Sequence, residues 1–281
     1  NYSVGGSLAD YVSHVRHYNN DNHTIGTPYT GQRLGEMWGY VIDGYFQTAE
    51  EIANHPVDQS YVNSMIEACV IDKGLHPGDL KFVDMDGDQV IAPTLTANDV
   101  KDMVVIGNSL PRFTHSLRLN AQWAGFDLSL LFNGVGRQHW YPGSETYLFW
   151  GPYSRPFTTY IPMDFYDKMW SEENPDAYFP RPRGYIAHSS DDSKGQGRAL
   201  STPNDRYLQD LAYCRLKNLT FGYSLPKKWM DKVKIKNLRI YLSGDNLLTF
   251  TKYPGVDPEY TNYDNLYSSL RQYSVGLNIA F

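Results

Sequence analysis

An acidic run in the first half of the chain has the residue types and the spacing of a cation site. Asp84, Asp86 and Asp88 stand at alternate positions, and the backbone carbonyl of Val90 follows two residues later. Ca²⁺ takes carboxylate and carbonyl oxygens offered at this spacing, and Ile91 supplies the apolar anchor that calcium loops have behind their ligands. The run therefore resembles the start of a Ca²⁺-binding loop and is a candidate Ca²⁺ site.

The rest of the acidic segment departs from a complete calcium loop. Gln89 occupies the position of the usual sharp-turn glycine, and Leu95 occupies that of the usual bidentate glutamate. Asp99 or Asp102 then has to return as a further ligand. The alternative is a loop of Asx turns, whose carboxylates accept from nearby backbone N–H groups and face solvent. Both interpretations stay open at this point.

Aromatic residues are abundant, with 23 Tyr, 12 Phe and 6 Trp among 281 residues, and one group of them lies in a long connection. Four members of the group are candidates for contacts with a substrate or a partner: Trp140, Tyr141, Trp150 and Tyr153. Flat aromatic faces stack on sugar rings or pack against another protein. The alternative is that the four residues pack a small core of the loop itself.

Residue patterns that carry catalysis are absent from the sequence. The eight histidines form no HExxH pair, and neither GxSxG nor GxxxxGK[ST] occurs, so no enzyme activity is expected. A net charge of −6 argues against a nucleic-acid partner. Cys69 and Cys214 match no zinc spacing and are interpreted as ordinary side chains.

The last nine residues of the chain show the alternation of a β-strand. Small or polar residues stand between large apolar ones, so one face of the strand is apolar and the other is polar. The apolar positions are Tyr273, Val275, Leu277, Ile279 and Phe281. Such a strand suits the closing edge of an outer-membrane β-barrel, with its apolar face toward lipid and its polar face toward the lumen. The last strand of a soluble sandwich is the alternative.

Five further segments have strand character. The six expected strands lie near residues 1–17, 112–123, 125–134, 207–224, 236–250 and 271–281. Gly5-Gly6 and the stretch Arg215–Asn218 interrupt the alternation, so a β-bulge is expected at each, and Ala124-Gly125 predicts a tight turn. Long loops are expected at 18–111 and 135–206.

The loops alternate in length along the chain, which favours a membrane barrel over a sandwich. Outer-membrane barrels join their strands by short periplasmic turns and long extracellular loops. The turns at Ala124-Gly125 and at 225–234 fall on one side, and the three longer loops fall on the other. Six strands do not close a barrel with a transport lumen, so the chain is expected to be part of a larger barrel. No run of about 20 apolar residues predicts a transmembrane helix.

Charged residues also fall on the face of the strands that points away from lipid. They are Arg118, Asp127, Arg239 and Asp245. Such residues line a pore or meet a plug, or they form salt bridges between strands on a wet barrel wall; we favour the salt bridges.

Seven stretches resemble, in the right order, segments of SusC/RagA-type TonB-dependent transporters. The first, Gly35–Tyr40 with Asp43–Gln47, resembles the family's GYxxDGxFQ segment. The others are Gly78–Ile91, Val105–Phe113, Gly125–Gly136, Tyr207–Pro226, Asn237–Glu259 and the aromatic terminus. The resemblance covers essentially the whole chain, but only the C-terminal quarter or so of such a transporter. Because the chain also opens at Asn1 without a signal peptide, we expect a piece of a longer protein.

The resemblance implies an all-β fold: the C-terminal strands of a 22-stranded barrel in the outer membrane of a Bacteroidetes-type bacterium. It also implies import of oligosaccharides or peptides, driven by TonB through an N-terminal region that this chain lacks. A SusD-like surface lipoprotein would cover the extracellular mouth, and outer-membrane lipid would surround the wall. The alternatives are a carbohydrate-binding β-sandwich, soluble or at the cell surface, and a secreted β-fold enzyme such as a glycoside hydrolase.

Overall fold

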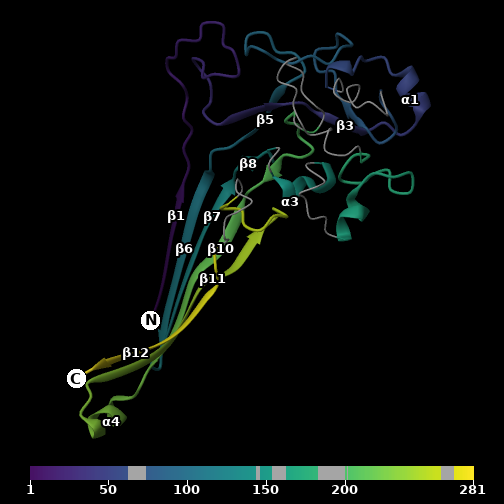
Figure 1. Ribbon diagram of the computed structural model, residues 1–281. Coiled ribbons are helices and arrows are strands. Elements are labelled where there is room, and N and C mark those ends of the chain that lie inside the picture. The colour runs from purple at the N-terminus through teal and green to yellow at the C-terminus, as the bar shows by residue number, and fades with distance from the viewer. Residues whose placement is uncertain (63–73, 144–145, 154–162, 183–199, 201, 261–268) are drawn as a thin grey trace.

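The computed structural model describes residues 1–62, 74–143, 146–153, 163–182, 200, 202–260 and 269–281. A long antiparallel sheet carries a group of loops at one end, and both termini lie toward the other end (Figure 1). The sheet has the strand order β1-β6-β7-β10-β11-β12. Its strands are β1 (Tyr2–Ala9), β6 (Arg112–Trp123), β7 (Phe126–Arg137), β10 (Tyr213–Ser224), β11 (Asn237–Thr251) and β12 (Gln272–Ala280).

The register of the sheet places apolar residues opposite one another across all six strands. One row runs Val4, Leu119, Leu130 and Leu219, and the next runs Leu128, Phe221, Leu242 and Val275. The exposed fraction reaches 76% at Val275 and 81% at Trp123, so the described part of the chain leaves these positions of the face uncovered. A continuous, uncovered apolar face on an extended sheet is the surface that a barrel wall presents to lipid.

The opposite face of the sheet is polar, and its side chains pair with one another. Ser7 and Ser116 share a hydrogen bond of 2.8 Å, and Asn120 accepts one of the same length from Ser129. Further along the sheet, Asn218 donates to Asp245 at 2.8 Å. This ladder crosses neighbouring strands, so the polar face is organised as a wall rather than as separate hydrated strands.

An ion pair on the polar face spans three strands, and a glycine makes room for it. Arg239 on β11 reaches over β10 and donates to Asp127 on β7, at 2.8 Å and 2.5 Å. The residue between them is Gly222, where a Cβ would lie 2.6 Å from the guanidinium of Arg239 and from a carboxylate oxygen of Asp127. This confirms the expected salt bridge between strands.

Several strand details differ from the sequence expectations. Strand β1 ends at Ala9 rather than near residue 17, and its pairing with β6 passes through Gly5-Gly6 without a register shift, so the bulge predicted there was wrong. Strand β10 begins at Tyr213, later than predicted. The register does shift between Leu216 and Asn218, which confirms the second predicted bulge.

The end of the sheet away from the loops holds two connections between strands. Ala124 and Gly125 both have positive φ, 50° and 88°, as a tight hairpin turn between twisted strands requires. The other connection folds into a short helix, α4 (Lys227–Met230), and a 3₁₀ turn (Asp231–Val233). Figure 1 shows α4 at the tip of this end.

The long connections contain short elements at the other end of the sheet. They are β2 (Glu36–Gly39), β3 (Ile42–Tyr45), α1 (Ala49–Asn54), β4 (Leu80–Phe82), β5 (Val104–Asn108), β8 (His139–Trp140), α3 (Tyr147–Trp150), two 3₁₀ turns (Gly151–Tyr153 and Met163–Lys168) and β9 (Gln209–Asp210). Strand pairs β2-β5, β3-β4 and β8-β9 hold them together. Within the described ranges, no helix has both the length and the apolar composition to cross a membrane.

The two faces of the sheet predict opposite responses to the same substitution at adjacent positions of β12. Val275→Arg places a charge on the apolar face, and in the full-length protein we expect it to lower the free energy of unfolding by about 2–4 kcal/mol. Ser274→Arg, on the polar face, should change it by less than about 1 kcal/mol, since the charge stays in water. Urea unfolding in lipid vesicles, followed by heat-modifiable mobility, measures both. Equal losses would contradict the assignment of the faces.

Candidate functional site

Described segments of the long connections share one core at this end of the sheet, and we call the described residues within 10–111 and 138–212 the loop domain. The core is aromatic, and several of its rings are fully buried, including Tyr40, Trp150, Tyr153 and Tyr207. Phe179 stacks on Tyr207 with ring centroids 5.8 Å apart. Segments distant in the sequence therefore pack into a single body rather than separate loops.

Arg206 joins three parts of the loop domain. Its Nε donates to the Tyr45 hydroxyl at 3.0 Å, and its Nη2 donates to the carbonyl of Ala177 at 2.6 Å. The guanidinium also lies 4.5 Å from the centre of the Tyr45 ring. Burial raises the pKa of Tyr45 above its ordinary value. Sequence reasoning did not single out Arg206, and no motif marked it.

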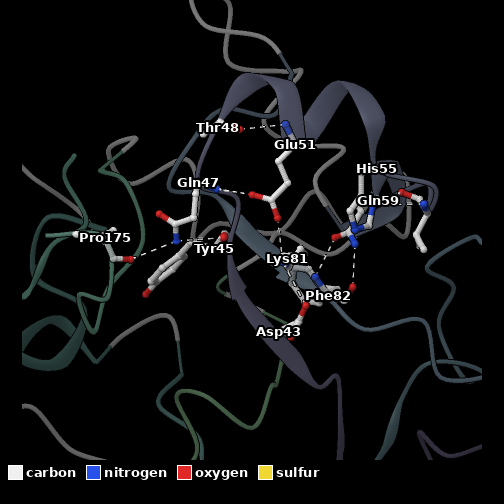
Figure 2. Close-up of polar contacts among 11 residues, drawn as sticks. Asp43, Tyr45, Gln47, Thr48, Glu51, His55, Gln59, Lys81, Phe82 and Pro175 are labelled. Carbon is white, nitrogen blue, oxygen red and sulfur yellow. Dashed lines mark hydrogen bonds and ion pairs between the residues drawn. The ribbon is translucent and has the colours of Figure 1, made fainter. Parts of the chain in front are cut away.

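Helix α1 is fixed to the β3-β4 pair by charge and by capping (Figure 2). The Thr48 hydroxyl accepts from the Glu51 N–H at 3.1 Å, and the Glu51 carboxylate accepts from the Gln47 N–H at 2.8 Å, which is a capping box shifted by one residue. Lys81 on β4 then contacts Glu51 at 2.9 Å and Asp43 at 3.2 Å. These contacts hold the segment that carries the GYxxDGxFQ resemblance.

The four aromatic residues predicted to face a substrate or a partner lie inside the loop domain. The exposed fraction is 0% for Trp150 and Tyr153 and 9% for Trp140. Tyr141 is partly buried, and its hydroxyl donates to the carbonyls of Leu200 and Thr202. Their burial favours the alternative, in which they pack the core of the loops, because buried rings have no face to offer a ligand.

A buried ion pair attaches the segment after β11 to the sheet. Arg215 on β10 is 2% exposed, and its Nη2 donates to Asp257 at 2.6 Å. Its Nε donates to Thr249 at 3.0 Å, and its Nη1 lies 3.1 Å from Glu259. Arg215 lies on the loop side of the β10 bulge. Its ion pair therefore attaches the segment that carries Asp257 to the loop end of the sheet. Nothing in the sequence indicated this ion pair, because both carboxylates lie more than 40 residues from Arg215 along the chain.

The predicted calcium ligands come together in part. Carboxylate oxygens of Asp84, Asp86 and Asp88 lie within 4.8 Å of one another. Asp84 accepts from the Gly87 and Gln89 N–H groups at 2.7 Å and 2.8 Å, as an Asx turn does. Gln89 adopts a φ of 67°, so it takes the left-handed conformation that a calcium loop usually gives to glycine.

Lysine, rather than a further acid, completes this cluster. Lys101 Nζ lies 3.0 Å from Asp86 and 3.9 Å from Asp88, and its hydrogen bond lowers the pKa of Asp86. Asp99, also predicted as a ligand, does not join the three carboxylates. Asp102 accepts instead from the Met85 and Ala92 N–H groups, both at 2.7 Å, while burial raises its pKa. The calcium site stays a prediction.

Three of the four charged residues predicted for the polar face of the sheet have a side-chain partner among the described residues, and one does not. Arg239 and Asp127 form the ion pair across β10, and Asp245 accepts from Asn218. Within the described ranges, the side chain of Arg118 makes no hydrogen bond or ion pair. Cys214 is a free thiol on β10, and Cys69 lies outside the described residues.

A two-faced antiparallel sheet, with a loop domain at one end and tight turns at the other, defines a segment of a transmembrane β-barrel wall. The chain is similar to two proteins of Formosa agariphila: TonB-dependent receptor P3 (30% identity over 266 residues, covering 89% of this chain and 22% of that protein) and TonB-dependent receptor P26 (27% over 223 residues, covering 73% and 20%). It spans about a fifth of their length. No protein-family model matches it.

Solved structures agree with the sequence relatives in fold. The chain superposes on the RagAB peptide transporter with a TM-score of 0.58 at 20% identity, covering 93% of this chain and 24% of that one. The "open-open" state of the RagAB peptide importer gives 0.55 at 19% identity, covering 94% and 24%. Over most of its length the chain therefore matches one part of the TonB-dependent receptors, which are outer-membrane proteins.

The buried ion pair of Arg215 predicts a large effect of its removal. Arg215→Met leaves Asp257 buried without its cation, so we expect the free energy of unfolding of the full-length protein to fall by about 3–5 kcal/mol. Lys217→Met is the control, because Lys217 is more exposed and only 4.0 Å from Glu259; its effect should stay below about 1 kcal/mol. Urea unfolding measures both, and equal effects would refute the role given to Arg215.

Replacing Lys101 tests the calcium prediction. Lys101→Met removes the ammonium beside Asp86, so only an added cation then offsets the repulsion among the three carboxylates. We expect faster protease cleavage between residues 84 and 102 in EDTA than in the wild type, with protection regained in Ca²⁺. Lys252→Met, at an exposed lysine that follows β11, should behave as wild type. If Ca²⁺ gives Lys101→Met no protection, the acidic run is an Asx-turn loop.

Proposed function

We propose that the chain is part of an importer that brings oligosaccharides or peptides across the outer membrane with energy delivered by TonB. The observation that carries the proposal is the six-stranded sheet with one continuous apolar face and one hydrogen-bonded polar face. Similarity to TonB-dependent receptors over 89% of the chain supports it. Their names and that of the RagAB importer describe receptors and an importer, not enzymes, which agrees with binding and passage rather than covalent chemistry.

The sheet forms one part of a closed barrel of 22 strands in this proposal. Strands β1 and β12 lie at the edges of the described sheet, and in a membrane their outward N–H and C=O groups need further strands as partners. The polar face, with Arg239 and Asp127, lines the lumen. The apolar face, including the five predicted positions of the terminal strand, meets lipid. Apart from Phe281, which follows the strand, these positions lie on β12.

The loop domain lies outside the cell in this proposal, and the tight turns lie in the periplasm. Long loops gather at one end of the sheet and tight turns at the other, as in outer-membrane barrels (Figure 1). The folded loop domain then supplies a rigid part of the substrate vestibule and of the surface that a SusD-like lipoprotein covers. Arg206 holds that surface in place, and Arg215 holds the segment after β11, rather than contacting the substrate.

Uptake by cells tests the proposal. Cells that carry the full-length protein should take up a fluorescent oligosaccharide or peptide from a mixed library, and cells depleted of TonB should not. We expect Arg206→Met to reduce uptake several-fold while the barrel still shows normal heat-modifiable mobility, because the loop domain loosens and the wall does not. Lys252→Met is the control. Uptake that survives TonB depletion would contradict the proposal.

A further inference from the structure

The turn between β10 and β11 carries a cluster of positive charges to which the proposed function assigns no role. Five of the chain's 25 lysines and arginines lie within residues 227–236, in a chain whose net charge is −6. We call this segment the basic turn; its lysines are Lys227, Lys228, Lys232, Lys234 and Lys236, and all five are exposed. Asp231 is the one acidic residue among them.

Nothing in the described part of the chain neutralises these lysines. None of the five takes part in an ion pair there, whereas Lys81 and Lys101 in the loop domain each contact two carboxylates. An uncompensated cluster of like charges is unfavourable by itself, and an anionic partner stabilises it.

The basic turn is folded and fixed to the sheet. The Met230 side chain is buried, the Ile235 N–H donates to the Met230 carbonyl at 3.2 Å, and Lys234 takes a left-handed conformation with φ of 57°. The Lys236 N–H donates to the carbonyl of Ala280 at 2.8 Å, beside the apolar side chain of Ile279. The lysines therefore begin where the apolar face of the sheet ends.

Each of the two connections at this end of the sheet has an exposed tryptophan. Trp229 within the basic turn is 59% exposed, and Trp123 beside the neighbouring tight turn is 81% exposed. Tryptophan favours the boundary between hydrocarbon and headgroups, and lysine extends its ammonium from that boundary to the phosphates. An acidic protein partner would explain the lysines but not their place at the rim of an apolar face.

We propose that the basic turn binds the phosphate headgroups of anionic phospholipids in the periplasmic leaflet of the outer membrane. The choice of leaflet rests on the orientation in the proposed function. Trp229 enters the headgroup boundary while the five ammonium groups attract the lipid phosphates. The turn thereby gathers anionic lipid around this edge of the wall.

Native mass spectrometry of the full-length protein tests this interaction. The protein is mixed in detergent with equal amounts of phosphatidylglycerol and phosphatidylethanolamine, and the retained lipids are counted. We expect the wild type to retain phosphatidylglycerol preferentially, with no loss on addition of inorganic phosphate. In a variant with all five lysines changed to Gln, the preference for phosphatidylglycerol should fall about tenfold. Lys252→Gln, at the other end of β11, should lose none.

The lipid site would be overturned if the wild type and the five-lysine variant preferred phosphatidylglycerol equally. Both barrels must show normal heat-modifiable mobility in this comparison. Displacement of the lipid by inorganic phosphate would overturn it too, since the turn would then be a free-phosphate site.

The orientation of the sheet in the membrane is measured separately with Lys232→Cys in a Cys69→Ser, Cys214→Ser background. An impermeant maleimide should label it only after the outer membrane is permeabilised. Labelling in intact cells would instead contradict the orientation on which the proposed function rests.

Discussion

The structure depends on one constraint: inside hydrocarbon, every backbone N–H and C=O group must find a partner within the protein. The four inner strands of the sheet meet this constraint by pairing on both sides, with one register shift near Leu216, and the edge strands β1 and β12 meet it on one side. Pairing fixes the register, and a shift by one residue would turn the apolar row through Leu242 and Val275 toward the lumen. The two faces are therefore consequences of one pairing scheme.

The polar wall and the loop domain follow from that scheme. Once alternate residues face the lumen, their polar groups either pair with one another or meet water, and Arg239 reaches Asp127 only because Gly222 lies between them. At the loop end, the buried Arg215 attaches the segment that carries Asp257 to the sheet, and the partly buried Arg206 joins segments within the loop domain. Side-chain contacts of guanidinium groups therefore take over where strand pairing ends.

Much of the sheet was predictable from the sequence because alternation with period two is a local signal, and long strands repeat it many times. Gly5-Gly6 misled because glycine is common both in bulges and in regular strands that pack closely. Strands β2 to β5 were not predicted, since they are three to five residues long and β2 pairs with a partner about 70 residues away.

The candidate site was less predictable than the sheet. An aromatic residue such as Trp150 has the same sequence signature whether it is a binding surface or a core, and only burial separates the two. The spacing of the acidic residues correctly indicated that three carboxylates lie close together. It gave no sign that Lys101 would contact them. The basic turn was visible as five lysines in ten residues, but its significance depends on its place at the rim of the sheet.

The most direct test of this account is the environment of successive residues along β12 in the full-length protein in lipid. Spin labels placed singly at positions 273 to 279, omitting the crowded Gly276, report their accessibility to oxygen in lipid and to a nickel reagent in water. The account predicts a period of two, with positions 273, 275, 277 and 279 accessible to oxygen and 274 and 278 accessible to nickel. Uniform accessibility to nickel would show that both faces meet water, and the wall would then be a soluble sheet.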